Sequence, residues 1–96
     1  MDDSIISEVK NYLNITWQDD ETDKNITNIA KRARSVLENY AGSDIDLSDG
    51  FVNQLFLDCC RYIYNHCYED YERNFESDLF YLRQSVKIKE MNRSAE

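Results

Sequence analysis

The chain has no proline and only two glycines among its 96 residues. Proline and glycine are the residues that interrupt helices and build tight turns, so a chain almost without them favours helices over a turn-rich β fold. A chain of this length forms one domain with a thin hydrophobic core. We therefore predict an all-α protein, a compact bundle of about four helices with a long third helix and no sheet. The predicted domain spans residues 1–86, and residues 87–96 are expected to form a flexible tail.

Hydrophobic spacing places the four helices. The first is predicted from about Ser4 to Leu13. The second starts after the cap Asp20 and ends at Gly42, which suits a left-handed C-terminal cap. After the loop 43–50, in which Ile45 and Leu47 point to the core, the third helix is capped by Ser48 or Asp49. It runs to about Tyr71. A fourth follows Asn74, with an apolar stripe of Phe75, Leu79, Leu82 and Val86.

The polar segment 14–23 joins the first two predicted helices and carries the single tryptophan. We expect Trp17 to pack against the helices. The acidic group Asp19, Asp20, Glu21 and Asp23 lacks the glycine and the spacing of an EF-hand loop, so helix capping and solvation are the better interpretation.

The stretch CCRYIYNHCY, residues 59–68, holds all three cysteines and the only histidine. Zinc ligands on a helix need a spacing of three or four residues, but Cys59 and His66 are seven apart, as are Cys60 and Cys67. No CxxC pair is present for redox chemistry. We predict buried cysteines, a packed histidine, no metal and no cofactor.

At about 100° per residue, the predicted third helix has two apolar faces. The first carries Val52, Phe56 and Cys59. The second is rich in tyrosine, which suits contacts between subunits. Its residues are the predicted subunit interface: Leu57, Cys60, Tyr64, Tyr68 and Tyr71.

The net charge of −8 argues against nucleic-acid binding as the main function. No apolar run reaches the length of a membrane span, and the segment MDDSIISEV lacks the features of a signal peptide. An odd cysteine count suits a reducing compartment. No nucleophile elbow or P-loop is present. These features predict a non-enzymatic interaction or assembly protein.

Two long stretches resemble the small helical head–tail connector (head completion or adaptor) proteins of tailed bacteriophages. They are EVKNYLNITWQDDETDKNITNIAKRARSVLENYAG and LFLDCCRYIYNHCYEDYERNFESDLFYLR, and together they cover about Glu8 to Arg83. The likeness lies in a short helix ending in YL, an acidic loop, a long helix, and then a CRY-like run followed by N-F-x-S-x-L.

This resemblance implies a virion assembly protein, present in the host cytoplasm during assembly and then in the virion. About a dozen copies would form a ring on the phage portal protein, extend the DNA channel, and offer a platform to the next connector or a tail completion protein. DNA would pass without specific binding, with Asp19, Asp20, Glu21 and Asp23 as candidate lining residues. The implied portal-docking segment contains Tyr81, Arg83, Lys87, Lys89 and Arg93.

Two alternatives stay open at this point. A small regulatory or protein-binding module would use the tyrosine-rich face in a two-fold dimer instead of a ring. A metal-dependent or thiol enzyme would bind zinc or hold a cysteine of low pKa, and the missing ligand spacing counts against it.

Overall fold

The computed structural model describes residues 3–94, with side chains described for residues 3–91. It is built from helices alone, and residues 3–94 contain no strand. The all-α prediction is confirmed. The number and lengths of the helices differ from the prediction, because residues 3–94 form five: α1 (Asp3–Tyr12), α2 (Asp20–Ala41), α3 (Gly50–Tyr64), α4 (Tyr68–Asn74) and α5 (Glu76–Ser94).

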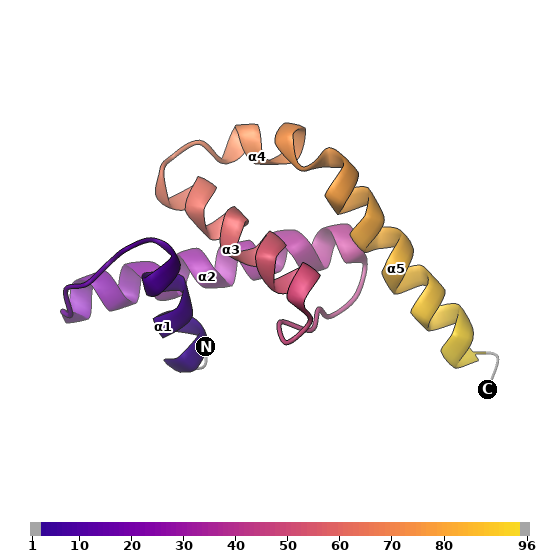
Figure 1. Ribbon diagram of the computed structural model, residues 1–96, viewed down its shortest axis with the longest axis horizontal. Coiled ribbons are helices and arrows are strands. Elements are labelled where there is room, and N and C mark those ends of the chain that lie inside the picture. Colours follow the sequence, from indigo (N-terminus) through magenta and orange to yellow (C-terminus); the bar gives the residue numbers. More distant parts are fainter. Residues whose placement is uncertain (1–2, 95–96) are drawn as a thin grey trace.

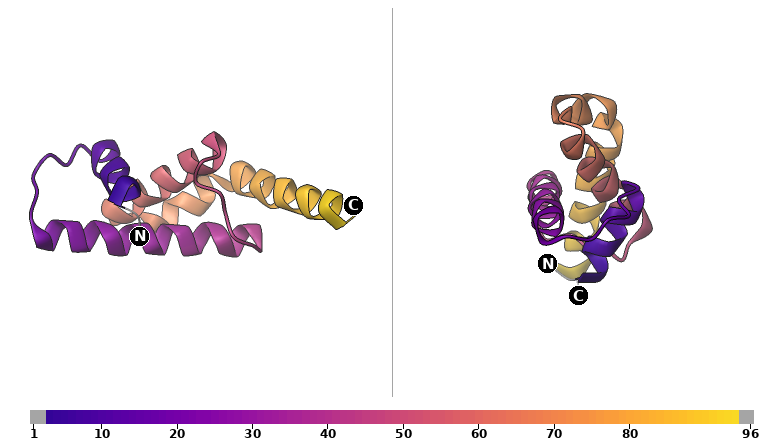
Figure 2. Two further views of the ribbon diagram at one scale, coloured as in Figure 1. Left: turned by 90° about the horizontal axis from the view of Figure 1, so that it is seen from below. Right: turned by 90° about the vertical axis from the view of Figure 1, so that its left-hand side faces the viewer.

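The longest helix is α2, with 22 residues, and not the third helix, which has 15. Helices α1, α3 and α5 all contact α2, so α2 is the element around which the others pack (Figure 1). The molecule is elongated and thin, with extents of 48 × 28 × 17 Å. The C-terminal half of α5 extends past the end of α2, which both Figure 1 and Figure 2 show.

The core follows the stripe predicted for α2. Its buried residues are Ile26, Ile29, Ala30, Ala33, Leu37 and Ala41. The small alanines let neighbouring helices approach, while burial of each large side chain contributes roughly 1.5–3 kcal/mol. Phe56, Cys59 and Cys60 of α3 are fully buried against this stripe, together with Leu79 and Leu82 of α5. Burial of Ile45 and partial burial of Leu47 confirm that the loop 43–49 packs onto the core.

The helix caps explain where α2 and α3 begin and end. Asp49 caps α3, as predicted, by accepting a hydrogen bond from the Val52 amide at 3.0 Å. Gly42 ends α2 in the left-handed region, with φ 76°. The N-cap of α2 is Asp19 and not the predicted Asp20, because its carboxylate accepts from the Thr22 amide at 2.7 Å.

The predicted third helix is split after Tyr64. His66 has φ 59°, its amide donates to the Ile63 carbonyl at 3.1 Å, and the Cys67 amide donates to the Tyr62 carbonyl at 2.9 Å. This pair of bonds is a Schellman motif, which stops a helix and turns the chain. The motif ends α3 and lets α4 return along it, so the predicted continuous helix to Tyr71 is wrong.

Helix α5 continues past Val86, where the predicted tail begins, to Ser94. The predicted packing of Trp17 is wrong, because 51% of it is exposed and its indole N–H donates to the Thr22 hydroxyl at 2.9 Å. No helix within residues 3–94 combines the length and the hydrophobicity needed to cross a bilayer.

Candidate subunit interface

Three of the five residues predicted to face a second subunit lie in the core of the chain itself. Leu57 is 7% exposed, and Cys60 and Tyr71 have no exposed surface. The Tyr71 hydroxyl donates to the Leu55 carbonyl at 2.8 Å, which fixes α4 on α3. The predicted interface needs correction here, because Leu57 and Cys60 belong to the hydrophobic core of the chain itself, and the turn at His66 brings Tyr71 back against α3.

The other two predicted interface residues, Tyr64 and Tyr68, are half-buried. The Tyr68 hydroxyl donates to the Glu72 carboxylate at 3.1 Å, and the Arg32 guanidinium lies 5.4 Å from the centre of its ring. Burial, followed by the bond to Glu72, raises the pKa of Tyr68 to about 12. Its hydroxyl therefore stays protonated at neutral pH, and most of its ring surface is already in contact within the chain.

The cysteine and histidine cluster does not converge on a point. Cys59 and Cys60 are buried in α3, while His66 lies exposed in the turn and Cys67 is half-buried after it. Within the described part of the chain, no group of three or more metal-ligating residues comes together. Burial raises the pKa of the Cys59 thiol to about 12 and raises that of Cys60 as well. The prediction of a packed histidine is wrong, because His66 is exposed.

The acidic residues near the start of α2 mainly serve that helix. Asp19 is its N-cap, and hydrogen bonds from the Thr22 amide and hydroxyl lower the pKa of its carboxyl group. Asp23 pairs with Lys10 at 2.7 Å and ties α1 to α2. Asp20 and Glu21 are exposed. This acidic end of α2 lies at the opposite end of the molecule from the projecting part of α5 (Figures 1 and 2).

Helix α5 has two apolar faces. Leu79, Leu82 and Val86 lie on the side that packs against the core. At about 100° per residue, a second group lies within a sector of about 100° on the opposite side. This group is the α5 outer face, and its exposed fractions are 64%, 61%, 57% and 71% for Phe80, Tyr81, Ile88 and Met91, respectively.

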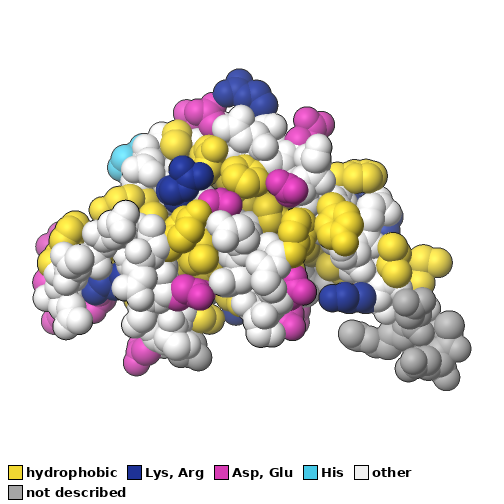
Figure 3. Space-filling model, in the orientation of Figure 1, with side chains coloured by type: hydrophobic (Ala, Val, Ile, Leu, Met, Phe, Trp, Pro, Cys, Tyr) yellow, Lys and Arg dark blue, Asp and Glu magenta, His cyan; other side chains and the backbone are white. Residues whose placement is uncertain are grey.

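The outer face continues onto α3. The Tyr81 ring packs edge-to-face on Phe51, with centroids 5.1 Å apart, and Phe51 is itself 36% exposed. Figure 3 shows hydrophobic side chains at the surface of α5 where it extends beyond the rest of the molecule. A run of large exposed apolar side chains on one helix face is typical of a contact surface and not of a helix that meets only water.

Charge is unevenly divided along the chain. Residues 79–94 contain four basic residues and one acidic residue, whereas residues 1–78 contain seven basic and seventeen acidic residues. Tyr81, Arg83, Lys87 and Lys89 of the implied portal-docking segment are exposed on α5, and the side chain of Arg93 lies outside the described residues. Residues 79–94 of α5 are therefore a basic and apolar extension on an acidic body.

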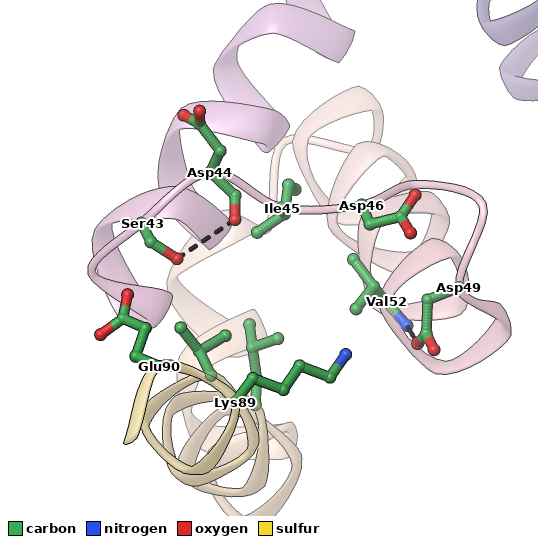
Figure 4. Close-up of a pocket in the computed structure, with 10 residues that line it drawn as sticks. Ser43, Asp44, Ile45, Asp46, Asp49, Val52, Lys89 and Glu90 are labelled. Carbon is green, nitrogen blue, oxygen red and sulfur yellow. Dashed lines mark hydrogen bonds between the residues drawn. The ribbon is translucent and has the colours of Figure 1, made fainter. Parts of the chain in front are cut away.

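A cleft of about 420 Å³ lies between the loop 43–49 and α5. Its floor is apolar: Ile45, Val52, Leu82 and Val86. Four carboxylates line its edge, with Asp44 and Glu90 at one end and Asp46 and Asp49 at the other, and Lys89 is the single basic residue among the described residues that line it (Figure 4). Hydrogen bonds from the Ser48 hydroxyl and amide lower the pKa of Asp46, so this edge is negatively charged at neutral pH.

Comparison with known proteins gives no match to a family model, a curated protein or a solved structure. The α5 outer face was not predicted, because the fourth helix was expected to end near Val86. The signal was helical spacing: Ile88 follows Tyr81 by seven residues, and Met91 follows Ile88 by three.

Proposed function

We propose that this chain is a structural assembly protein, the subunit of a connector ring that docks on a phage portal and extends its DNA channel. The α5 outer face carries the proposal. It presents large apolar side chains to solvent on a helix that projects from the body. Full burial of each side chain would contribute roughly 1.5–3 kcal/mol to association. A few of them can therefore offset the translational and rotational freedom that two subunits lose when they bind.

The resemblance to connector proteins gives this surface a role. Several copies would place α5 between neighbouring subunits and the portal, with Tyr81, Arg83, Lys87, Lys89 and Arg93 as the candidate portal contacts. The opposite, acidic end of each subunit would then supply Asp19, Asp20, Glu21 and Asp23 as candidate channel-lining residues. Carboxylates there would repel the phosphate backbone and let DNA pass without binding.

In this role the chain has no substrate and needs no cofactor. Its partners are copies of itself, the portal protein, and the next connector or a tail completion protein. The α5 outer face supports such a scaffold, because an interface needs exposed apolar side chains and no reactive group. The alternative, a dimeric regulatory module, would use the same outer face in a two-fold pairing.

Native mass spectrometry of the wild-type chain over a concentration series tests the proposal. We expect a discrete closed species of about a dozen subunits. A stable dimer at every concentration would favour the regulatory module. A monomer calls for a second measurement, binding to a ring of the portal protein encoded nearest to this gene, and failure of that binding as well would rule out the connector.

A further inference from the structure

The projecting end of α5 and the acidic cleft complement each other in charge and in polarity. We propose that Lys87, Ile88 and Met91 of one copy, the α5 arm, seat in the cleft between the loop 43–49 and α5 of the next copy. The inference rests on the proposed function and names the contact that would build the ring, and it moves Lys87 from the candidate portal contacts to this contact between copies. Such a contact is head-to-tail, because two different surfaces meet, and it closes into a ring when the rotation permits.

The α5 arm cannot seat in the cleft of its own chain. Leu82 and Val86, which line the cleft, lie on the inner side of α5. At about 100° per residue, Ile88 and Met91 lie on the opposite side of the same helix. A rigid helix cannot turn both sides to one cleft, so an α5 arm that seats in this cleft belongs to another copy.

The cleft fits the chemistry of the arm. Its floor contains the half-buried Val52 and Val86, which would cover the apolar ends of Ile88 and Met91. Its edge carries Asp44 and Asp46, both exposed, which would lie near the ammonium group of Lys87. Opposite charges around an apolar contact fix the orientation of two partners and exclude wrong pairings.

The same charges disfavour the pairing of two α5 helices. Residues 79–94 are basic, so a two-fold contact along the outer face would bring like charges together. A contact between the arm and the acidic body brings unlike charges together. It should therefore weaken as salt is added, since exposed charges are screened over about 8–10 Å at ordinary ionic strength.

Charge reversal tests the contact. One variant reverses the cleft (Asp44→Lys with Asp46→Lys), one reverses the arm (Lys87→Glu), and a matched control makes the same charge change as the cleft variant at the far end of α2 (Asp20→Lys with Glu21→Lys). Sedimentation velocity gives the self-association constant of each, and circular dichroism checks that each is folded. We expect the cleft variant to self-associate at least about tenfold more weakly than the wild type, with the control changed by less than about threefold.

Mixing the arm variant with the cleft variant should restore association, because an acidic arm then meets a basic cleft. An unchanged constant for the cleft variant would overturn the inference and indicate α5–α5 pairing. An equal loss in the control would also overturn it and indicate a general effect of net charge. If the wild-type chain stays monomeric up to about 1 mM, its copies do not bind one another. That result would overturn this inference and leave the proposed function standing. The proposed function fails only if binding to the portal ring fails too.

Discussion

Helices α3 and α5 share one feature of their sequences and have opposite surroundings. Each carries apolar residues on two faces. In α3 both faces are covered by the chain, and Phe56, Cys59 and Cys60 have no exposed surface. In α5 the inner face is covered, but Phe80 and Met91 remain 64% and 71% exposed. An apolar face in a sequence thus becomes core or contact surface according to what folds back over it.

The turn after Tyr64 adds α4 to the helices that cover α3. It returns α4 so that Tyr71 packs against Tyr62 and Phe75, with ring centroids 5.5 Å and 4.9 Å away, and its hydroxyl reaches the Leu55 carbonyl. No element within residues 3–94 returns over the outer face of α5 in this way. Helices α1, α2 and α4 contact α3, whereas the described chain leaves the outer face of α5 open.

The largest expected effect comes from placing a carboxylate on the second apolar face of α3 and on the outer face of α5. Cys60→Asp buries an unpaired charge, which costs several kcal/mol and is enough to unfold a small domain. Ile88→Asp puts the same group on a side chain that is 57% exposed and should leave the melting temperature within a few degrees. Thermal melts followed by circular dichroism compare the two. If Ile88→Asp unfolded the chain, the outer face of α5 would be buried in solution, as the second apolar face of α3 is.

Alkaline pH should destabilise the core through the buried thiols. Their pKa values are raised in the folded chain, to about 12 for Cys59, from an ordinary value of about 9. The unfolded chain therefore loses these protons first, and stability falls as pH rises above about 9. The slope is about 1.4 kcal/mol per pH unit for each thiol, so two thiols give a loss of about 3 kcal/mol by pH 10.

Urea unfolding at pH 7, 9 and 10 measures this loss. Cys59→Ala with Cys60→Ala should flatten the pH dependence between pH 9 and 10, even though the variant is less stable at pH 7. An unchanged slope would show that the thiols are not buried in solution.

Tyr71→Phe and Tyr81→Phe remove the same hydroxyl group from a buried and an exposed site. The first leaves the Leu55 carbonyl without the Tyr71 donor and should lower the free energy of unfolding by about 1–2 kcal/mol. The second should change it by less than about 0.5 kcal/mol, because Tyr81 is 61% exposed. Urea unfolding at neutral pH gives both values. Equal effects would mean that α4 does not hold Tyr71 against α3.

The smallest expected effect sharpens the role of the turn. His66 adopts φ 59°, a conformation that glycine adopts without a steric penalty. His66→Gly should raise the free energy of unfolding by up to about 1 kcal/mol. Asn65→Gly is the control, since Asn65 has φ −89° and should gain nothing. A loss of stability in His66→Gly would show that the turn has another conformation.

Much of the fold could be predicted from local chemistry. The spacing of Ile26, Ile29 and Leu37 marks the buried side of α2, and Gly42 and Asp49 mark helix ends through well-defined capping geometry. These features act within a few residues, so the sequence shows them directly.

The rest of the fold depends on residues that depart from their usual backbone conformation and on packing between distant segments. A histidine in the left-handed region gives no signal comparable to a glycine, so the end of α3 was missed. Two apolar faces blur the periodicity of α5, so its length and its outer face were missed as well. Whether Tyr71 is an interface or a core residue depends on where α4 packs. The spacing of residues along one helix carries no information about that position.

The most direct test of the central claim compares assembly in the wild type with Ile88→Asp plus Met91→Asp, using sedimentation velocity over a concentration series. Trp17→Asp is the control, because Trp17 is 51% exposed and belongs to the segment between α1 and α2, which lies at the other end of the molecule from the projecting part of α5. If the α5 outer face is the assembly surface, the double variant stays a folded monomer while the wild type and the control form the large closed species. A double variant that assembles like the wild type would contradict it.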